Sequence, residues 1–383
     1  MRNLIRRATL AAVSATVLGL LTTAGGPAAA ISAHSGRGPG SPLPALKPFR
    51  IGPSSGPGSV AVEPDGALVV AYAIKAGHGK TVVCVLNRGA RACRSRTTLT
   101  PLSGDTLFGT TYAFVSSANH VEVIQEACCD ASPAGGDLLW TSANGGTSFG
   151  APTRFGTLGI TAAALVGSYI VYMPGGDSSA QVGAVPVGAG EAPGTIATPV
   201  PGAAAGVGIG SYHSGALVAA DDLATPDTTH VAYARAGSDF DATAAYHRVA
   251  TFKGEAVIGL SGGALLTEKT SGQDQLELRL FNGQGFGPAH TVPHASGGGP
   301  EWFTIDQDPS GRVHVFNEST HLARAYHLYE VSTSTGARWT RPADLGNAIQ
   351  DNSFAAGLDG NGSGLVLGTS PAWGYPVPAQ NVS

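Results

Sequence analysis

The chain has 383 residues, of which 13% are charged, and its formal net charge at pH 7 is −4. A nucleic-acid-binding protein needs a basic face, so this charge balance excludes that class of function. With 55 glycines and 25 prolines, and with short apolar runs that Gly or Pro interrupts, the composition indicates short strands and tight turns.

Residues 1–30 have the pattern of a cleaved signal peptide. Three arginines form a basic start, residues 8–24 are apolar, and three alanines ending at Ala30 supply a small-residue cleavage site. No later segment reaches the roughly 18 apolar residues of a membrane span. We therefore expect cleavage after Ala30, a disordered Gly/Pro/Ser-rich leader at 31–45, and a single secreted, extracellular domain over 46–383.

The predicted outer strands of this domain repeat a short pattern that begins with proline and ends with glycine. Its copies are Pro48–Gly52 (PFRIG), Pro152–Gly156 (PTRFG) and Pro342–Gly346 (PADLG), and Asn282–Pro288 is a degraded copy. Proline and glycine at these places are typical of strand ends and turns.

A second, independent series consists of apolar hairpins that turn at polar or glycine residues. The seven hairpins span Val60–Tyr72, Phe114–Ile124, Ala163–Tyr172, Ile209–Ala219, Ala256–Thr267, Phe303–Phe316 and Phe354–Leu367. Their turn centres lie roughly 46 to 54 residues apart, which is the spacing of four-stranded β-propeller blades.

The repeats leave one strand over at each end of the domain. The seventh hairpin has too little chain after it for a complete blade, and Pro48–Gly52 precedes every inner hairpin. A ring in which the N-terminal strand completes the C-terminal blade removes this free edge. The sequence therefore predicts an all-β, seven-bladed propeller closed by N- and C-terminal strands. Six blades is the alternative, and two tandem sandwiches would not repeat the same two-part unit seven times.

Four cysteines, an even number in a chain predicted to be exported, indicate disulfides. Cys84 and Cys93 flank eight residues, and a two-residue hairpin loop at Arg88-Gly89 would place the two cysteines opposite each other. The pair would then be non-hydrogen-bonded, where the Cα atoms of facing strands lie closest. We expect a Cys84–Cys93 disulfide.

Cys128 and Cys129 are adjacent in the sequence. A bond between them could brace the loop from Glu126 to Asp137, or it could form a rigid apolar ring that contacts a ligand at the propeller rim. Free thiols or cross-pairing with the other two cysteines are further alternatives.

Leu138–Gly159 reads as a strand, a tight turn and a second strand. Within it, Ser142, Asn144, Gly146 and Phe149 have the spacing Ser-x-Asn-x-Gly-x-x-Phe. This spacing resembles the Asp-box (BNR repeat) of the sialidase-like β-propeller superfamily, Ser-x-Asp-x-Gly-x-x-Trp. A second, degraded copy consists of Ser332, Ser334, Gly336 and Trp339. In that family the box is a structural hairpin between the two outer strands of a blade.

The resemblance also implies a hypothesis of catalysis, because sialidases use three arginines on the substrate carboxylate, a Tyr–Glu pair and an Asp. Phe49-Arg50-Ile51-Gly52 is similar to the motif that carries the first arginine, with Gly52 in place of Pro. The repeat aligns Arg50 with the outer-strand residue Arg154, which cannot reach a central site. Candidates for the other arginines are Arg279, Arg312 and Arg324.

Other chemical motifs are weak. Tyr329 and Glu330 alternate in a strand and so cannot share a face, and Asp308 is a turn residue before Pro309-Ser310-Gly311. The remaining acidic candidates are Asp306, Glu301 and Glu318, which the sequence alone cannot bring together. The spacings of His321 with His327 and of His290 with His294 do not make a zinc site. We expect neither a catalytic residue, a metal nor a cofactor, and we treat the arginines at positions 88, 91, 94 and 96 as a solvated face.

The leading interpretation is a secreted, monomeric propeller that acts as a non-catalytic binding or scaffold module for a glycan, a peptide or an envelope protein. Variable loops on a rigid ring would do the binding. The alternatives are an exo-α-sialidase-type glycoside hydrolase and, third, another polysaccharide-active propeller such as a lyase. Carbohydrate binding requires exposed aromatic side chains, with Trp140, Trp302 or Trp373 as candidates and Trp339 as a structural residue.

Overall fold

A computed structural model describes residues 47–378 except 55, 75–78, 130–135, 156–158, 175–179, 190–195, 201–204, 223–224, 226–227, 270–274, 294–301, 322–324, 341, 348–353 and 369–371. The predicted signal peptide and leader therefore lie outside the described residues. Within them the chain forms seven antiparallel sheets and one three-residue 3₁₀ helix, η1 (Thr243–Ala245). None of the helices in these ranges is long and apolar enough to cross a membrane.

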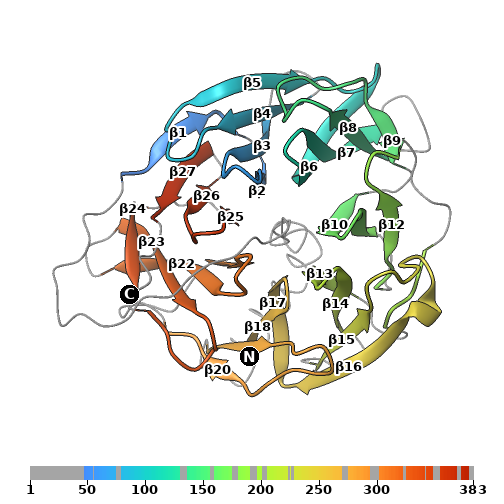
Figure 1. Cartoon of the computed structure of the whole chain (residues 1–383), viewed down its shortest axis with the longest axis vertical. Helices are drawn as coiled ribbons and strands as arrows, with labels where there is room; N and C mark the ends of the chain where they lie inside the picture. Colours follow the sequence, from blue (N-terminus) through green and yellow to red (C-terminus); the bar gives the residue numbers. More distant parts are fainter. Residues whose placement is uncertain are drawn as a thin grey trace, which may run out of the picture.

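Each sheet is one blade of a propeller (Figure 1). Blade 1 comprises β2 (Ser59–Val62), β3 (Leu68–Ile74), β4 (Lys80–Leu86) and β5 (Cys93–Leu99). Blade 2 comprises β6 (Asp105–Ser117), β7 (His120–Cys129), β8 (Asp137–Ser142) and β9 (Thr153–Phe155). Blade 3 comprises β10 (Ile160–Val166), β11 (Tyr169–Pro174) and β12 (Gly183–Pro186).

The second half of the ring continues the same order. Blade 4 comprises β13 (Ala205–Tyr212), β14 (Gly215–Asp221), β15 (Thr228–Ala234) and β16 (Tyr246–Lys253). Blade 5 comprises β17 (Glu255–Ser261), β18 (Ala264–Lys269), β19 (Leu276–Leu280) and β20 (His290–Thr291). Blade 6 comprises β21 (Trp302–Gln307), β22 (Val313–His321), β23 (Ala325–Thr333) and β24 (Ala343–Asn347). Blade 7 comprises β25 (Phe354–Leu358), β26 (Gly364–Gly368), β27 (Ala372–Val377) and β1 (Phe49–Gly52).

The ring is closed by strands from both ends of the chain, as the sequence predicted. β1 is the outermost strand of blade 7 and pairs antiparallel with β27, with Phe49 opposite Gly374 and Arg50 opposite Trp373. Figure 1 shows the blue N-terminal strand beside the red C-terminal strands at the outer edge of the ring. The seven predicted inner hairpins are the first two strands of each blade, so the prediction of seven blades is confirmed and the six-bladed alternative is wrong.

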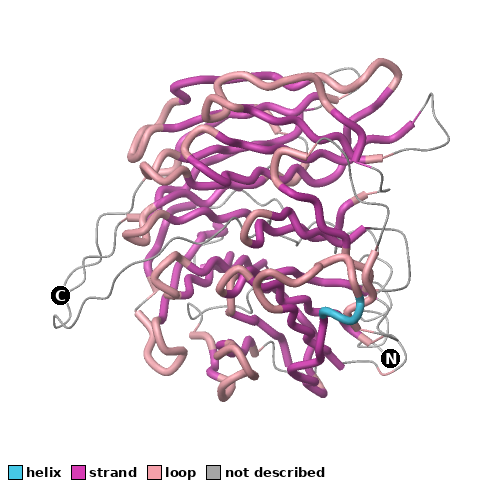
Figure 2. Tube along the Cα trace, turned by 45° about the vertical axis from the view of Figure 1, so that its right-hand side comes forward, coloured by secondary structure: helices cyan, strands magenta, loops and turns pink. Residues whose placement is uncertain are grey.

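Within a blade, the inner strands are more buried than the strand at the outer edge. Every residue of β4 except Lys80 is buried, whereas β5 alternates between half-buried and exposed positions until Leu99. A strand between two others packs on neighbouring blades through both faces, and an outermost strand turns one face to solvent. Figure 2 shows that strands make up most of the described chain, with η1 at one margin.

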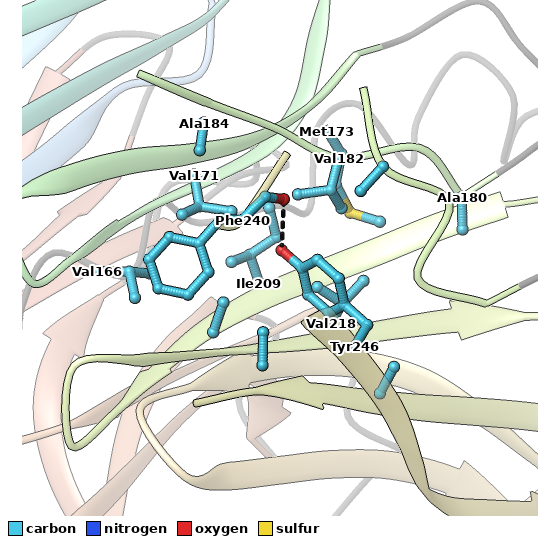
Figure 3. Packing of buried hydrophobic residues seen from close by; sticks show 14 of the residues in the cluster. Val166, Val171, Met173, Ala180, Val182, Ala184, Ile209, Val218, Phe240 and Tyr246 are labelled. Carbon is cyan, nitrogen blue, oxygen red and sulfur yellow. Dashed lines mark hydrogen bonds between the residues drawn. The ribbon is translucent and has the colours of Figure 1, made fainter. Parts of the chain in front are cut away.

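The core consists of seven apolar clusters, one between each pair of adjacent blades. The cluster between blades 3 and 4 is built from small residues, with Phe240 and Tyr246 as its large members (Figure 3). The Tyr246 hydroxyl donates to the Phe240 carbonyl at 3.1 Å, which satisfies the polar end of a buried ring. The cluster between blades 7 and 1 joins Ile51 and Leu367 to Leu86, so apolar packing also closes the ring.

Blade 3 has three named strands, and its outer edge is covered in another way. Val182 forms an isolated bridge with Ala197, and the Ala184 amide donates to Asp241 Oδ1 at 2.5 Å. Pro186, at the end of β12, has no amide hydrogen. The outward donors of β12 are thus paired or absent, which prevents pairing with another chain at this edge.

The predicted Cys84–Cys93 disulfide is present, with Cα atoms 5.4 Å apart. The predicted two-residue loop is wrong, because Leu86 rather than Cys84 pairs with Cys93 and a bulge separates Val85 from Leu86. The chain first makes a turn in which the Ala90 amide donates to the Asn87 carbonyl at 2.9 Å, and two further residues precede β5. The longer loop shifts the register, and the disulfide joins the two strands diagonally.

Cys128 and Cys129 end β7, opposite Thr106 and Asp105. Their side chains and residues 130–135 lie outside the described part of the chain. The alternatives for this pair therefore stay predictions.

Candidate functional site

The turn at Ser142–Phe149 is a hydrogen-bonded unit between β8 and β9, the two outer strands of blade 2. The Ser142 hydroxyl accepts from the Gly146 amide at 3.0 Å, and Asn144 Oδ1 accepts from the Ser148 amide at 2.9 Å. Phe149 packs half-buried against the core between blades 1 and 2. These contacts are internal to the turn and brace the hairpin between β8 and β9.

The second predicted copy, between β23 and β24, is built differently. The Gly336 amide donates to Thr333 Oγ1 at 2.9 Å, while the Ser332 amide donates to Thr340 Oγ1 at 2.8 Å. In the first copy the glycine amide binds the serine hydroxyl of Ser142, whereas in the second copy it binds Thr333 instead of Ser332 or Ser334. Trp339 packs half-buried on the core between blades 5 and 6.

The arginines that were candidates for a catalytic triad lie in separate networks. Arg279 in blade 5 is buried and donates to Glu255 Oε1 at 2.8 Å and to Glu277 Oε2 at 3.0 Å. Arg312 in blade 6 donates to Ser332 Oγ at 3.4 Å, and Arg50 is on the outermost strand of blade 7. Arg324 lies outside the described residues. The three described candidates, Arg50, Arg279 and Arg312, therefore do not converge on one site.

A buried acid–histidine cluster holds blade 6 together. His314 Nδ1 lies 2.7 Å from Glu330 Oε1, and Nε2 lies 3.2 Å from Asp308 Oδ2, with all three side chains 0% exposed. Burial alone would lower the pKa of His314, but hydrogen bonds and the charges of both carboxylates outweigh it and raise the pKa to about 9. Burial also raises the pKa of Asp306 to about 7. The three side chains of the cluster are closed off from solvent.

The remaining acidic and histidine candidates do not form a site either. Glu318 is buried in β22, and Glu301 lies outside the described residues. His327 pairs with Asp344 at 3.0 Å. Within the described ranges, no group of three or more His, Cys, Asp and Glu side chains could hold a metal ion.

The described tryptophans do not form an exposed aromatic patch. Trp140 is 1% exposed and belongs to the core between blades 1 and 2, so its prediction as a rim residue is wrong. Trp373 packs half-buried on the core between blades 6 and 7, and the Trp302 side chain is outside the described residues. Three tryptophans, Trp140, Trp339 and Trp373, therefore fill space between blades, which the sequence cannot reveal without the strand register.

The strongest candidate site is a groove on the outer side of the ring, at the seam between blades 7 and 1. Its volume is about 320 Å³. We call it the seam groove, and its lining residues are Phe49, Arg50, Ile51, Leu86, Arg91, Ala92, Cys93 and Arg96. Three come from β1 and the others from β4, β5 and the loop between them, so the groove exists because ring closure brings the two outer edges together.

The arginines that line the seam groove differ in where their side chains lie. Arg96 Nη2 donates to the Ile51 carbonyl and lies 3.4 Å from Cys93 Sγ, which fixes this side chain across the seam. Arg50 is opposite Trp373, which packs between blades 6 and 7, so the Arg50 side chain lies on the face of β1 away from Ile51 and the seam. Arg91 is exposed, and its side chain makes no hydrogen bond or ion pair with another described residue. The hairpin side of the groove therefore carries one anchored arginine, Arg96, and one exposed arginine, Arg91.

The neighbouring arginines of the same hairpin are neutralised. Arg88 Nη2 lies 2.6 Å from Asp359 Oδ2, and Arg94 Nη2 lies 2.9 Å from Glu63 Oε2. The solvated face expected from the sequence thus divides into two paired arginines and two that line the groove. The signal that could have revealed this was the ring closure itself, which places Arg50 beside the hairpin of blade 1.

Comparison with known proteins supports the fold. No family model matches the chain, and no curated protein matches it in sequence. Solved propellers resemble it at low identity. A chain in the crystal structure of a mitotic checkpoint complex is 9% identical with a TM-score of 0.54, covering 92% of this chain and 100% of that one.

Two further structures give similar values. The β-propeller domain of Cps50 (Swd1) from Myceliophteria thermophila is 12% identical with a TM-score of 0.54, covering 87% of this chain and 99% of that one. A puromycin hydrolase mutant complexed with PGG is 14% identical with a TM-score of 0.51, covering 85% of this chain and 54% of the hydrolase. Because one propeller fold supports many functions, these similarities define the architecture alone.

Proposed function

We propose that this protein is an exported propeller that acts as a non-catalytic binding module, with the seam groove as its ligand site. The observation that carries the proposal is that the exposed Arg91 lines the same groove as Arg96, which its bond to the Ile51 carbonyl holds in place. Guanidinium groups match the geometry of carboxylates and phosphates, so these two arginines are suited to recognition of an anionic ligand.

Two features support export as part of this proposal. Residues 1–30 have signal-peptide composition, and the Cys84–Cys93 bond requires an oxidising compartment. Mass spectrometry of protein recovered from the medium should give a chain that begins at Ile31. Protein retained in cells with an intact N-terminus would contradict export.

A relationship to sialidase-like propellers is a further part of the proposal. It is supported by the turn in which the Ser142 hydroxyl binds the Gly146 amide between the two outer strands of blade 2. A fluorogenic sialoside tests the alternative of a glycoside hydrolase directly. Turnover above that of heat-unfolded protein would replace the binding-module proposal with the enzymatic one.

The binding function itself is tested by applying purified, labelled protein to arrays of peptides and glycans. We expect saturable binding to at least one class of acidic ligand, and loss of that binding after thermal unfolding. Failure to bind any feature of either array would contradict the proposed function.

A further inference from the structure

The sequence contains three Asn-Gly pairs, and all three lie in turns. Asn144-Gly145 lies between β8 and β9, Asn282-Gly283 between β19 and β20, and Asn361-Gly362 between β25 and β26. Asparagine before glycine is typical of tight turns. The pair is also chemically labile, because glycine has no side chain to hinder the attack of its nitrogen on the carbonyl of the asparagine side chain. The surroundings of the three pairs differ, so the fold decides which of them reacts.

Two of the three glycine nitrogens are held by hydrogen bonds to main-chain carbonyls. The Gly145 amide donates to the Asn119 carbonyl at 3.0 Å, and the Gly362 amide donates to the Asp359 carbonyl at 2.9 Å. Each bond must break before the nitrogen can lose its proton and bond to a carbon atom. The fold therefore protects the pairs in the turns of blade 2 and blade 7.

The third pair, in the turn between β19 and β20 of blade 5, is not held in this way. Asn282 is exposed, and the Gly283 amide donates no hydrogen bond to any residue in the described part of the chain. Its nitrogen can therefore lose a proton without first breaking a bond to the protein. The Asn282 Nδ2 atom likewise makes no hydrogen bond with a described residue, so nothing in that part of the chain retains it as a leaving group.

The carbonyl that the Gly283 nitrogen would attack is already polarised. Asn282 Oδ1 accepts from the Gln284 amide at 3.0 Å and from the Gly285 amide at 3.0 Å. Each bond closes a ring that contains the Gly283 nitrogen, which keeps the Asn282 Cγ atom near that nitrogen. Two N–H groups on one carbonyl oxygen also stabilise the negative charge that develops there when a nucleophile adds, as in an oxyanion hole.

We propose that Asn282 is a site of self-modification, at which the folded protein converts this asparagine into aspartate or isoaspartate. The Gly283 nitrogen gives its proton to solvent and bonds to Cγ of Asn282. The bond from Cγ to Nδ2 breaks, and Nδ2 takes a proton from solvent and leaves as ammonia. One water molecule then opens the cyclic imide, which gives aspartate when it adds at Cγ and isoaspartate when it adds at the main-chain carbon. The inference is independent of the proposed binding function.

The product changes the outer part of blade 5. Asn282 lies next to Phe281, which forms an isolated bridge with Phe286, and both rings pack in the core between blades 4 and 5. Aspartate at position 282 can keep the two amide bonds and strengthens them by its charge. Isoaspartate instead adds one carbon to the main chain inside the turn that this bridge closes. Either product gives an exposed turn a new negative charge.

The experiment follows the three Asn-Gly pairs while the whole purified, folded protein ages in buffer at neutral and at mildly alkaline pH. Samples are digested at acidic pH, where the imide forms slowly, and chromatography with tandem mass spectrometry separates the asparagine, aspartate and isoaspartate forms. The control is the same chain unfolded in guanidinium chloride, which exposes all three pairs to solvent equally. Asn282→Gln is the matched variant, because glutamine must form a larger ring. Circular dichroism verifies that the aged samples are folded.

In the folded protein we expect Asn282 to convert at least about fivefold faster than Asn144 or Asn361, as for one hydrogen bond that does not have to break. Conversion should be faster at alkaline pH, because the glycine nitrogen must lose its proton. In guanidinium chloride the three rates should become similar. Asn282→Gln should abolish fast conversion in this turn and leave the other two pairs unchanged.

Equal rates at the three pairs in the folded protein, or no conversion of Asn282, would overturn the assignment. The same excess of Asn282 conversion in the unfolded chain would also overturn it, because the sequence rather than the fold would then set the rate. Asn361 is a demanding comparison, since its carboxamide, oriented so that its oxygen accepts from the Arg88 guanidinium, is polarised as well. Faster conversion of Asn361 than of Asn282 would show that a free glycine nitrogen is not the deciding feature.

Discussion

Loss of the Cys84–Cys93 disulfide should destabilise the propeller by an amount that the loop length sets. The two cysteines are separated by 9 positions. Closing a loop of about ten residues removes about 9 cal/mol/K of chain entropy from the unfolded state, or about 2.7 kcal/mol at 25 °C. For a chain of 383 residues, this corresponds to a fall in melting temperature of about 3 to 4 °C.

The assay is urea denaturation of wild type and of the double variant Cys84→Ala/Cys93→Ala, each with and without reductant. Reduction should lower the free energy of unfolding of the wild type by about 2 to 3 kcal/mol more than that of the variant. Thiol titration verifies that the wild type is fully reduced. The comparison also tests the second pair, because a variant that still responds to reductant must contain a bond involving Cys128 or Cys129.

Two results would refute this reasoning. Fully reduced wild type that is as stable as the oxidised protein would show that the loop is already ordered in the unfolded state. A loss that is the same in wild type and variant would assign the whole effect to the other cysteines. In either case the disulfide would not be what holds the loop wall of the seam groove.

Two further predictions concern buried charge. Arg279→Ala leaves the buried carboxylate of Glu255 without its cation, whereas Glu277 keeps its ion pair with Lys269. The variant should lose about 3 to 5 kcal/mol of unfolding free energy, and Arg248→Ala, at an exposed arginine, should change it by less than about 0.5 kcal/mol. Equal effects of the two substitutions in urea denaturation would contradict this. Folding raises the pKa of His314 from 6.5 to about 9, so its stabilising contribution is complete below pH 6.5 and is lost as the pH rises through about 9. Thermal melts should show that alkaline loss in wild type but not in His314→Gln, and parallel profiles would contradict it.

The blade pattern could be predicted because it is local. Each inner hairpin is marked in the sequence by two apolar runs separated by a turn. One such turn is Ser310-Gly311, where Gly311 has a φ of +82° in the structure. The outer strand Pro342–Gly346 was found by similarity to Pro48–Gly52, and both are outermost strands in the structure. Short-range signals of this kind predict the fold because the strand-pairing hydrogen bonds of each blade lie within its own sheet.

What the sequence could not supply was anything that depends on register or on contacts between blades. The bulge beside Val85 moved Cys93 opposite Leu86, and no residue type in the loop specifies that shift. Trp140 was a candidate for an exposed ring until its strand position placed it in a core. The seam groove was hidden for the same reason, since β1 and the hairpin of blade 1 meet only in the closed ring.

If the seam groove is the ligand site, as proposed, ligand binding and closure of the ring are linked. β1 is held to β27 by strand pairing and to blade 1 by the apolar cluster that includes Ile51 and by the Arg96 bond to the Ile51 carbonyl. A ligand that contacts both β1 and Arg91 on the hairpin would add interactions across this same seam. Because such a ligand binds only the closed ring, mass action makes it stabilise closure in proportion to its concentration over its Kd. The seam, where the first and last blades meet, is therefore the place where a peripheral ligand can strengthen the whole propeller without reaching its axis.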